Sequence, residues 1–166
     1  IAVTSHRGSS AFNLSTFHGI ESELKPVIPY SYDREKITPY DYSVYLDEEE
    51  TSVYYAVSNQ SGIYELDFDR TDPLFVILNS RRGELKWDGK AFSGYQQLQN
   101  NTRIFVYMEP DVQPQSVKNE TASGTNAHIV LSYPPNTMRL NLRYGISFID
   151  AEQAKKNLSR EIPDFD

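Results

Sequence analysis

The side chains best suited to acid–base or metal chemistry are three histidines. His6 lies in TSHRGSS, where its imidazole, the guanidinium of Arg7 and a glycine share a polar turn that could present a ligand-binding edge. A solvated loop explains the same composition equally well. His128 lies in the apolar segment AHIVLSY and is expected to be a structural residue of a strand. HExxH, paired-histidine and EF-hand spacings are absent and there is no cysteine, so the sequence predicts no metal site made by this chain alone.

A lone tryptophan and a run of acidic residues are the next candidates. In GELKWDGKAFSG, Trp87 and Phe92 could stack on a sugar ring, although a single tryptophan beside a turn is more often a core anchor. The segment DEEE, residues 47–50, is interpreted as the solvated end of a hairpin. The sequence contains neither a glycine-rich phosphate loop nor a recognisable Ser/His/Asp pattern. It therefore predicts no catalytic residue in this chain.

Composition limits the class of protein and its partners. The chain has 166 residues, 39% of them hydrophobic, with 12 Tyr and 8 Phe, which is typical of a globular domain with a core. The net charge of −7 argues against nucleic acid, because phosphate binding requires a basic face. The sequence also has no apolar run long enough to predict a membrane span.

Hydrophobic periodicity predicts short antiparallel strands. The segment 138–148 alternates strictly between apolar and polar residues over six repeats of period two. Asn59–Gly62 and the dipeptide Asp88-Gly89 are hairpin signals between such segments, and Leu74–Asn79 is apolar enough for a strand covered on both faces. Residues 1–40 are weakly patterned and are expected to be loop with a strand or two, and residues 110–126 to be a polar loop. The predicted fold is an all-β antiparallel sandwich.

One helix is predicted near the carboxyl end. Asp150 can cap it, Gln153 stands three residues further on, and Pro163 ends it. Its apolar stripe is narrow, so we expect the helix to lie on the surface of the sandwich. The predicted organisation is a β-sandwich over residues 1–149 followed by a linker helix over residues 150–166.

This carboxyl-terminal segment resembles the end of the N-terminal domain of glycoside hydrolase family 92, the calcium-dependent exo-acting α-mannosidases. Two weaker similarities are the stretch 30–46, which keeps a Pro…Tyr-x-Val-x-Leu pattern, and the turn TSHRG near the start. The matching residues are Gly145, Ile146, Ser147, Phe148, Ala154, Asn157, Leu158, Glu161, Ile162 and Pro163, with Pro39, Tyr42, Val44 and Leu46 in the second region and His6 and Gly8 in the third.

The resemblance implies a supersandwich-like domain joined by a helical linker to an (α/α)6-barrel, which would carry the catalytic carboxylates and the calcium. The chain is then expected to be a fragment, inactive alone, of an inverting α-mannosidase that acts on mannose-containing glycans. Its partner would be the missing barrel of the same polypeptide. His6 and Arg7 would contribute to the wall of the substrate pocket. The family resemblance also implies a periplasmic, secreted or cell-surface protein.

Two other functions remain open from the sequence. One is a free-standing carbohydrate-binding sandwich that uses Trp87 and neighbouring tyrosines, and the other is a structural or interaction domain. An exposed Trp87 on a concave aromatic face would favour the binding module. An exposed apolar patch beside the predicted helix would favour the mannosidase fragment, because a partner domain would cover such a patch.

Overall fold

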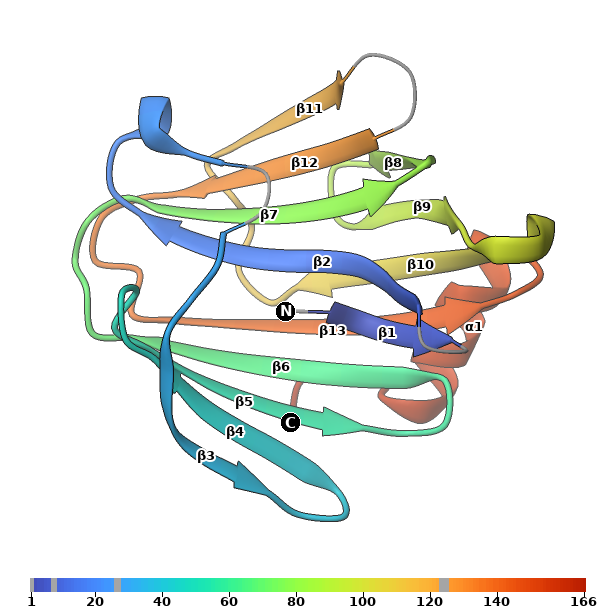
Figure 1. Ribbon diagram of the computed structural model, residues 1–166, viewed down its shortest axis with the longest axis horizontal. Coiled ribbons are helices and arrows are strands. Elements are labelled where there is room, and N and C mark those ends of the chain that lie inside the picture. Colours follow the sequence, from blue (N-terminus) through green and yellow to red (C-terminus); the bar gives the residue numbers. More distant parts are fainter. Residues whose placement is uncertain (1, 7–8, 26–27, 123–125) are drawn as a thin grey trace.

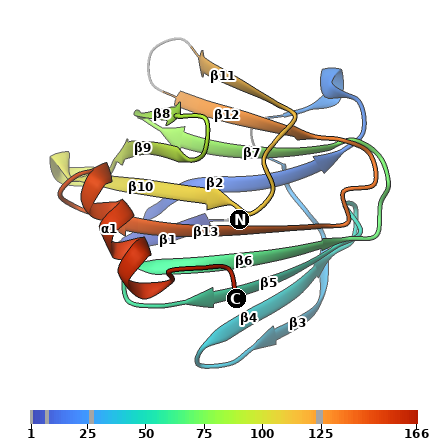
Figure 2. The same cartoon turned by 180° about the vertical axis from the view of Figure 1, so that it is seen from behind.

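The computed structural model describes residues 2–6, 9–25, 28–122 and 126–166. In these residues two antiparallel sheets face each other, and one helix lies on the outer side of the larger sheet (Figures 1 and 2). The smaller sheet has the order β1 (Ala2–His6), β2 (Ser9–His18), β7 (Leu74–Arg81), β12 (Asn126–Tyr133), β11 (Ser116–Ala122). The larger has the order β3 (Tyr32–Ile37), β4 (Asp41–Leu46), β5 (Thr51–Val57), β6 (Ser61–Phe68), β13 (Arg139–Ser147), β10 (Arg103–Pro110), β9 (Phe92–Gln97), β8 (Gly83–Trp87). The helix is α1 (Ala151–Glu161), and the single-turn 3₁₀ helices are η1 (Glu21–Glu23) and η2 (Gln99–Asn101). The all-β sandwich predicted from the sequence is confirmed.

The core lies between the sheets and follows the predicted alternation. Leu140, Leu142 and Tyr144 of β13 are buried in the main apolar cluster, as the period-two pattern predicts. Met138 and Phe148, the outermost residues of that pattern, lie beyond the ends of β13 and are about half exposed. The pattern therefore identifies the strand and its buried face but extends past both of its ends.

β7 is buried on both faces, as its uninterrupted apolar run predicts. Leu74, Val76 and Leu78 belong to the main core, whereas Phe75 and Ile77 point to the opposite side. Leu24 and Ile28, from the connection between β2 and β3, pack over that second side. Because β7 is also paired with β2 and β12, it is enclosed in every direction.

α1 is capped as predicted and packs closely on the larger sheet. The Asp150 carboxylate accepts a hydrogen bond from the backbone N–H of Gln153 at 2.7 Å. Gly145 of β13 permits the close approach, since a Cβ built there would lie 2.2 Å from the carbonyl oxygen of Ala154. Asn157 is buried and donates to the carbonyl oxygen of Ile146 at 2.9 Å. The helix is thus joined to β13 by backbone contact as well as by side chains (Figure 2).

Two predictions of loop are wrong. The first 40 residues contain three strands, β1, β2 and β3, rather than one or two, and β11 lies inside the predicted polar loop 110–126. β1, β3 and β11 are edge strands, with a neighbour on one side only. Edge strands keep polar side chains on their open surfaces, so their sequences lack the apolar alternation that identifies a central strand. All of β3 is exposed, and in β11 Val117 packs against the core.

Within the described residues, no helix is long and apolar enough to cross a membrane.

Candidate functional site

The structure does not bring the predicted site residues together. His6 is the last residue of β1, at an edge of the smaller sheet, and Arg7 lies outside the described residues. Trp87 is the last residue of β8, at an edge of the larger sheet. β11, an edge strand of the smaller sheet, lies next to β8, and its Asn119 side-chain amide donates a hydrogen bond to the carbonyl oxygen of Leu85 at 3.1 Å. Because β1 and β11 are opposite edges of the smaller sheet, His6 and Trp87 lie on opposite sides of the sandwich.

Trp87 lies against the core. Its side chain is half-buried and packs against the main apolar cluster, with its ring edge-on to Phe92 at a centroid distance of 5.3 Å. This is the position of a core anchor at a strand end.

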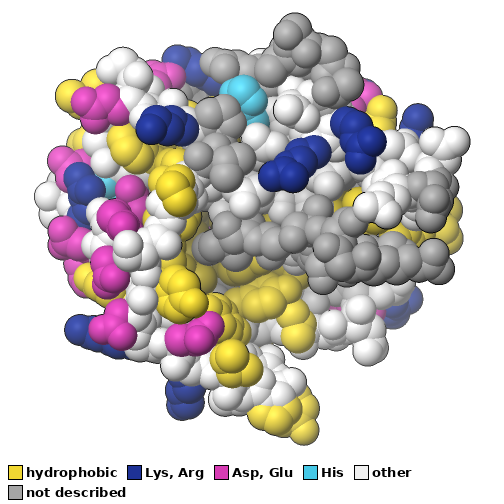
Figure 3. Space-filling view, viewed as in Figure 1, with side chains coloured by type: hydrophobic (Ala, Val, Ile, Leu, Met, Phe, Trp, Pro, Cys, Tyr) yellow, Lys and Arg dark blue, Asp and Glu magenta, His cyan; other side chains and the backbone are white. Residues whose placement is uncertain are grey.

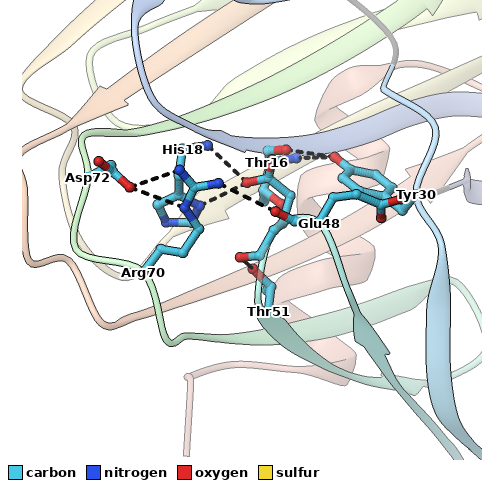
Figure 4. Close-up of polar contacts among 8 residues, drawn as sticks. Thr16, His18, Tyr30, Glu48, Thr51, Arg70 and Asp72 are labelled. Carbon is cyan, nitrogen blue, oxygen red and sulfur yellow. Dashed lines mark hydrogen bonds and ion pairs between the residues drawn. The ribbon is translucent and has the colours of Figure 1, made fainter.

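A group of polar contacts with a buried centre lies at the end of the sandwich away from α1. We call it the His18 cluster, and Figure 4 shows most of its members. It forms where β2 ends, where β4 turns into β5, and where β6 connects to β7. Its residues are Thr16, His18, Tyr30, Glu48, Glu49, Thr51, Arg70 and Asp72.

His18 and Glu49 form the buried centre of this cluster. One carboxylate oxygen of Glu49 accepts both the backbone N–H of His18 and its ring Nδ1, each at 2.9 Å. The His18 side chain is 0% exposed and that of Glu49 is 6% exposed. Because the carboxylate acts as acceptor, Nδ1 is the nitrogen that donates its proton to Glu49. Nε2 is buried, has no hydrogen-bond partner among the described residues, and the ring stands edge-on to Phe68.

The burial of Glu49 contradicts the prediction that DEEE is a wholly solvated hairpin end. The turn folds over the end of β2, so one of its carboxylates faces inward while its neighbour Glu48 binds Ser31 on the surface. No local pattern distinguishes Glu49 from Glu48, because the partner of Glu49, His18, is 31 positions away. His18 was likewise the one histidine to which the sequence assigned no role.

The outer members of the cluster hold the surrounding loops in place by hydrogen bonds and an ion pair. The Tyr30 hydroxyl donates to the carbonyl oxygen of Thr16 at 2.7 Å and accepts from its N–H at 2.8 Å, and burial raises its pKa. Hydrogen bonds from Ser31 lower the pKa of the Glu48 carboxyl. The Arg70 guanidinium donates to Asp72 at 2.9 and 3.1 Å and lowers the pKa of that carboxyl.

We interpret the His18 cluster as a structural feature that stabilises the loops at this end, and not as a reaction centre. A general acid or base must reach the atom to which it transfers a proton, and the side chain of His18 is fully enclosed. The described part of the chain also holds no group of three or more His, Asp or Glu side chains that could bind a metal ion.

The fold defines the class of protein: an antiparallel β-sandwich domain with a helix docked on one sheet. The model of the glycosyl hydrolase family 92 N-terminal domain matches residues 11–147. This chain belongs to that family, as the resemblance at its carboxyl end predicted.

Solved structures with the same fold come from longer proteins. The family GH92 inverting mannosidase BT2199 from Bacteroides thetaiotaomicron VPI-5482 superposes with a TM-score of 0.76 at 22% identity, covering 93% of this chain and 24% of that one. The family GH92 α-mannosidase BT3965 from Bacteroides thetaiotaomicron gives 0.78 at 12% identity, covering 92% and 26%. The glycosyl hydrolase ccman5 of the same family gives 0.66 at 18%, covering 82% and 23%. The chain thus spans about a quarter of each of these proteins. Among curated proteins, none matches it.

Proposed function

We propose that this chain is the N-terminal sandwich of an inverting exo-α-mannosidase that acts on mannose-containing glycans, and that it is inactive without the catalytic domain. The observation that carries the proposal is the family match over residues 11–147. The superposed mannosidases support it with the fold alone.

The domain's contribution would be to complete the interface with the barrel and part of the pocket wall. Phe148 and Ile149, immediately before α1, are 48% and 72% exposed, which is the kind of apolar patch that a partner domain covers. A second group of hydrophobic side chains gathers over the lower part of the molecule in Figure 3, where β3–β5 extend past the smaller sheet. The end of β1, next to Arg7, lies at the same end of the sandwich as α1 (Figures 1 and 2). A barrel docked at this end would therefore lie close to the end of β1, where His6 stands.

The chemistry would belong to the barrel. Inverting glycoside hydrolysis requires a general acid at the leaving oxygen and a general base that holds water on the opposite face of the sugar. Bound calcium would supply an electrophile for sugar hydroxyl groups. The sandwich would exclude bulk water and orient the glycan. Consistent with the family resemblance, we place the whole protein in the periplasm, outside the cell or on its surface.

The free-standing binding module receives less support. It relied on an exposed Trp87 on a concave aromatic face, and the Trp87 ring is half-buried against Phe92.

The proposal can be tested on the complete product of the source gene. The reading frame should continue past Asp166 for several hundred residues with helical periodicity, and the purified product should release mannose from α-mannosides with inversion at the anomeric carbon. A panel of α-glucosides and β-mannosides serves as the control. Retention of configuration, or release of a different sugar, would overturn the proposal.

A further inference from the structure

The outer face of the larger sheet is covered by α1 mainly over β10 and β13, with a smaller contact to β6, and no described helix covers it over β3–β5 (Figure 2). On the open part lies a groove of about 260 Å³, which we call the Tyr54 groove. It belongs neither to the His18 cluster nor to the proposed pocket wall. Its lining residues are Lys36, Asp41, Tyr42, Ser43, Tyr54, Tyr55, Ala56, Ile63 and Glu65.

Strand register explains why the groove exists. Lys36 pairs with Ser43, Ser43 with Tyr54, and Tyr54 with Glu65, so these four residues form one row across four strands on one face. Asp41, Ala56 and Ile63 form the adjacent row in the same way. The small side chains of Ser43 and Ala56 leave a hollow beside the much larger ring of Tyr54.

The polar groups around this hollow are available to a ligand. The side chains of Lys36, Asp41 and Ser43 make no hydrogen bond or ion pair to the part of the chain that the structure describes. Among the described residues, Glu65 forms an ion pair with Arg139 alone, at 3.4 Å. Tyr54 is 47% exposed, although it lies in the interior of this four-strand surface.

We infer that the Tyr54 groove binds a single neutral sugar ring. The Tyr54 ring, Ala56 and Ile63 supply an apolar surface for the C–H face of a pyranose, and the surrounding amine, carboxylate and hydroxyl groups match its hydroxyls. One positive and two negative groups at the rim favour an uncharged ligand over an anion. The volume is just under the ~300 Å³ at which drug-sized pockets begin, so it suits one ring and not an extended chain. The site would hold glycan at a distance from the catalytic pocket.

The test is an NMR titration of the 166-residue chain with methyl α-mannoside, methyl α-glucoside and glucuronate. Chemical shifts should move at the amides of Ser43, Ala56 and Ile63, with a dissociation constant of order 1 mM for the neutral sugars. Tyr54→Ala should weaken binding by about tenfold, because a stacked ring contributes roughly that factor. Tyr40→Ala is the matched control, since Tyr40 is a tyrosine 80% exposed that does not line the groove, and it should leave binding unchanged.

A second variant separates loss of the ligand contact from loss of fold. Ala56→Leu fills the hollow while keeping Tyr54, and it should also weaken binding by about tenfold at an unchanged midpoint of thermal unfolding. Absence of shifts at about 50 mM sugar, far above the expected dissociation constant, would overturn the inference. So would shifts confined to other strands, stronger binding of glucuronate, or concentration-dependent dimerisation through the groove. The two tests are independent, because this one measures binding and the other measures mannose release. A negative binding result would not affect the mannosidase proposal, and a negative activity result would not affect the inference about the Tyr54 groove.

Discussion

Two buried carboxylates stabilise different parts of the sandwich. At the end away from α1, Glu49 accepts hydrogen bonds from the backbone N–H and the ring of His18, and so joins the turn after β4 to the end of β2. On the larger sheet, Glu109 of β10 is paired with Arg143, the middle residue of β13, and accepts hydrogen bonds from it at 2.7 Å and from the Tyr107 hydroxyl at 2.9 Å. The Arg143 guanidinium also donates to the carbonyl oxygen of Ile162, just past α1, at 2.8 Å.

The two contacts therefore have different roles: one stabilises loops locally, and the other connects the sheet to the segment after the helix. The His18 cluster closes loops within the sandwich, and its loss should loosen only that end. The Arg143–Glu109 pair connects the sheet to the segment after α1, where the Arg143 guanidinium also lies 4.8 Å from the centroid of the Phe165 ring. Loss of this pair should therefore release the segment after α1 and alter the direction in which the chain continues.

The largest effect is expected from Gly145→Ala. The added methyl would lie 2.2 Å from the Ala154 carbonyl oxygen and 2.9 Å from the Leu158 nitrogen, so α1 must move away from the sheet. We expect a loss of about 3 kcal/mol in the free energy of unfolding, measured in urea, and faster hydrogen exchange in α1. Gly89→Ala is the control: nothing lies within 4 Å, but its positive φ should cost about 1 kcal/mol. Equal losses in the two variants would contradict the close packing of α1.

Arg143→Met should have the next largest effect. It leaves Glu109 nearly buried with only the exposed Lys90, at 3.6 Å, as a charged partner. The expected loss is about 2 kcal/mol, less than the ~3–5 kcal/mol of fully enclosed pairs. Arg139→Met is the matched control, because Arg139 is exposed and pairs with Asp67 and Glu65 on the surface. It should leave the unfolding midpoint unchanged. If both arginine variants behave alike, the docking role of Arg143 is wrong.

Glu49→Gln should cost less, about 1 kcal/mol, because one amide oxygen can still accept both hydrogen bonds from His18, although without the negative charge of the carboxylate. Hydrogen exchange should accelerate around the turn after β4 and at the end of β2 but not in α1. Exposed Glu48 provides the control, and Glu48→Gln should change stability less than Glu49→Gln does. Accelerated exchange in α1 would contradict this expectation, because it would show that the His18 cluster and α1 are coupled.

The smallest effect concerns pH. Burial opposes ionisation of Glu109, but hydrogen bonds from Arg143 and Tyr107 outweigh it and lower the pKa of this carboxyl below its ordinary 4.5. A lowered pKa stabilises the fold above the unfolded-state value, and this contribution disappears as pH falls through the folded value. The stability difference between the native chain and Glu109→Gln should therefore be constant near neutrality and shrink below pH 4.5. A difference that grows on acidification would contradict this assignment.

The parts of the fold that the sequence predicted are those specified by neighbouring residues. The alternation through β13, the Asp150 cap and the Asp88-Gly89 turn, where Gly89 has a φ of +98°, are all local patterns. Edge strand β11 was missed because it has little apolar surface to reveal it. His18–Glu49 and Arg143–Glu109 were missed because pairing at separations of 31 and 34 positions depends on sheet topology.

The candidate sites were predicted or missed for the same reason, namely whether they depend on local pattern or on strand register. Trp87 could be named from its type alone, but its half-burial follows from Phe92 across the hairpin. The Tyr54 groove could not be found in the sequence, because its row of residues comes from four strands whose register must be known. The wall residues His6 and Arg7 remain predictions.

The central claim is that this sandwich serves a catalytic domain that it does not itself contain. The most direct test measures mannose released from 4-nitrophenyl α-mannoside and from α-mannobiose, with calcium and with chelator, by the 166-residue chain and by the full product of its gene. We expect calcium-dependent release by the full product and none by the chain. Calcium-dependent release by the purified chain alone would contradict it.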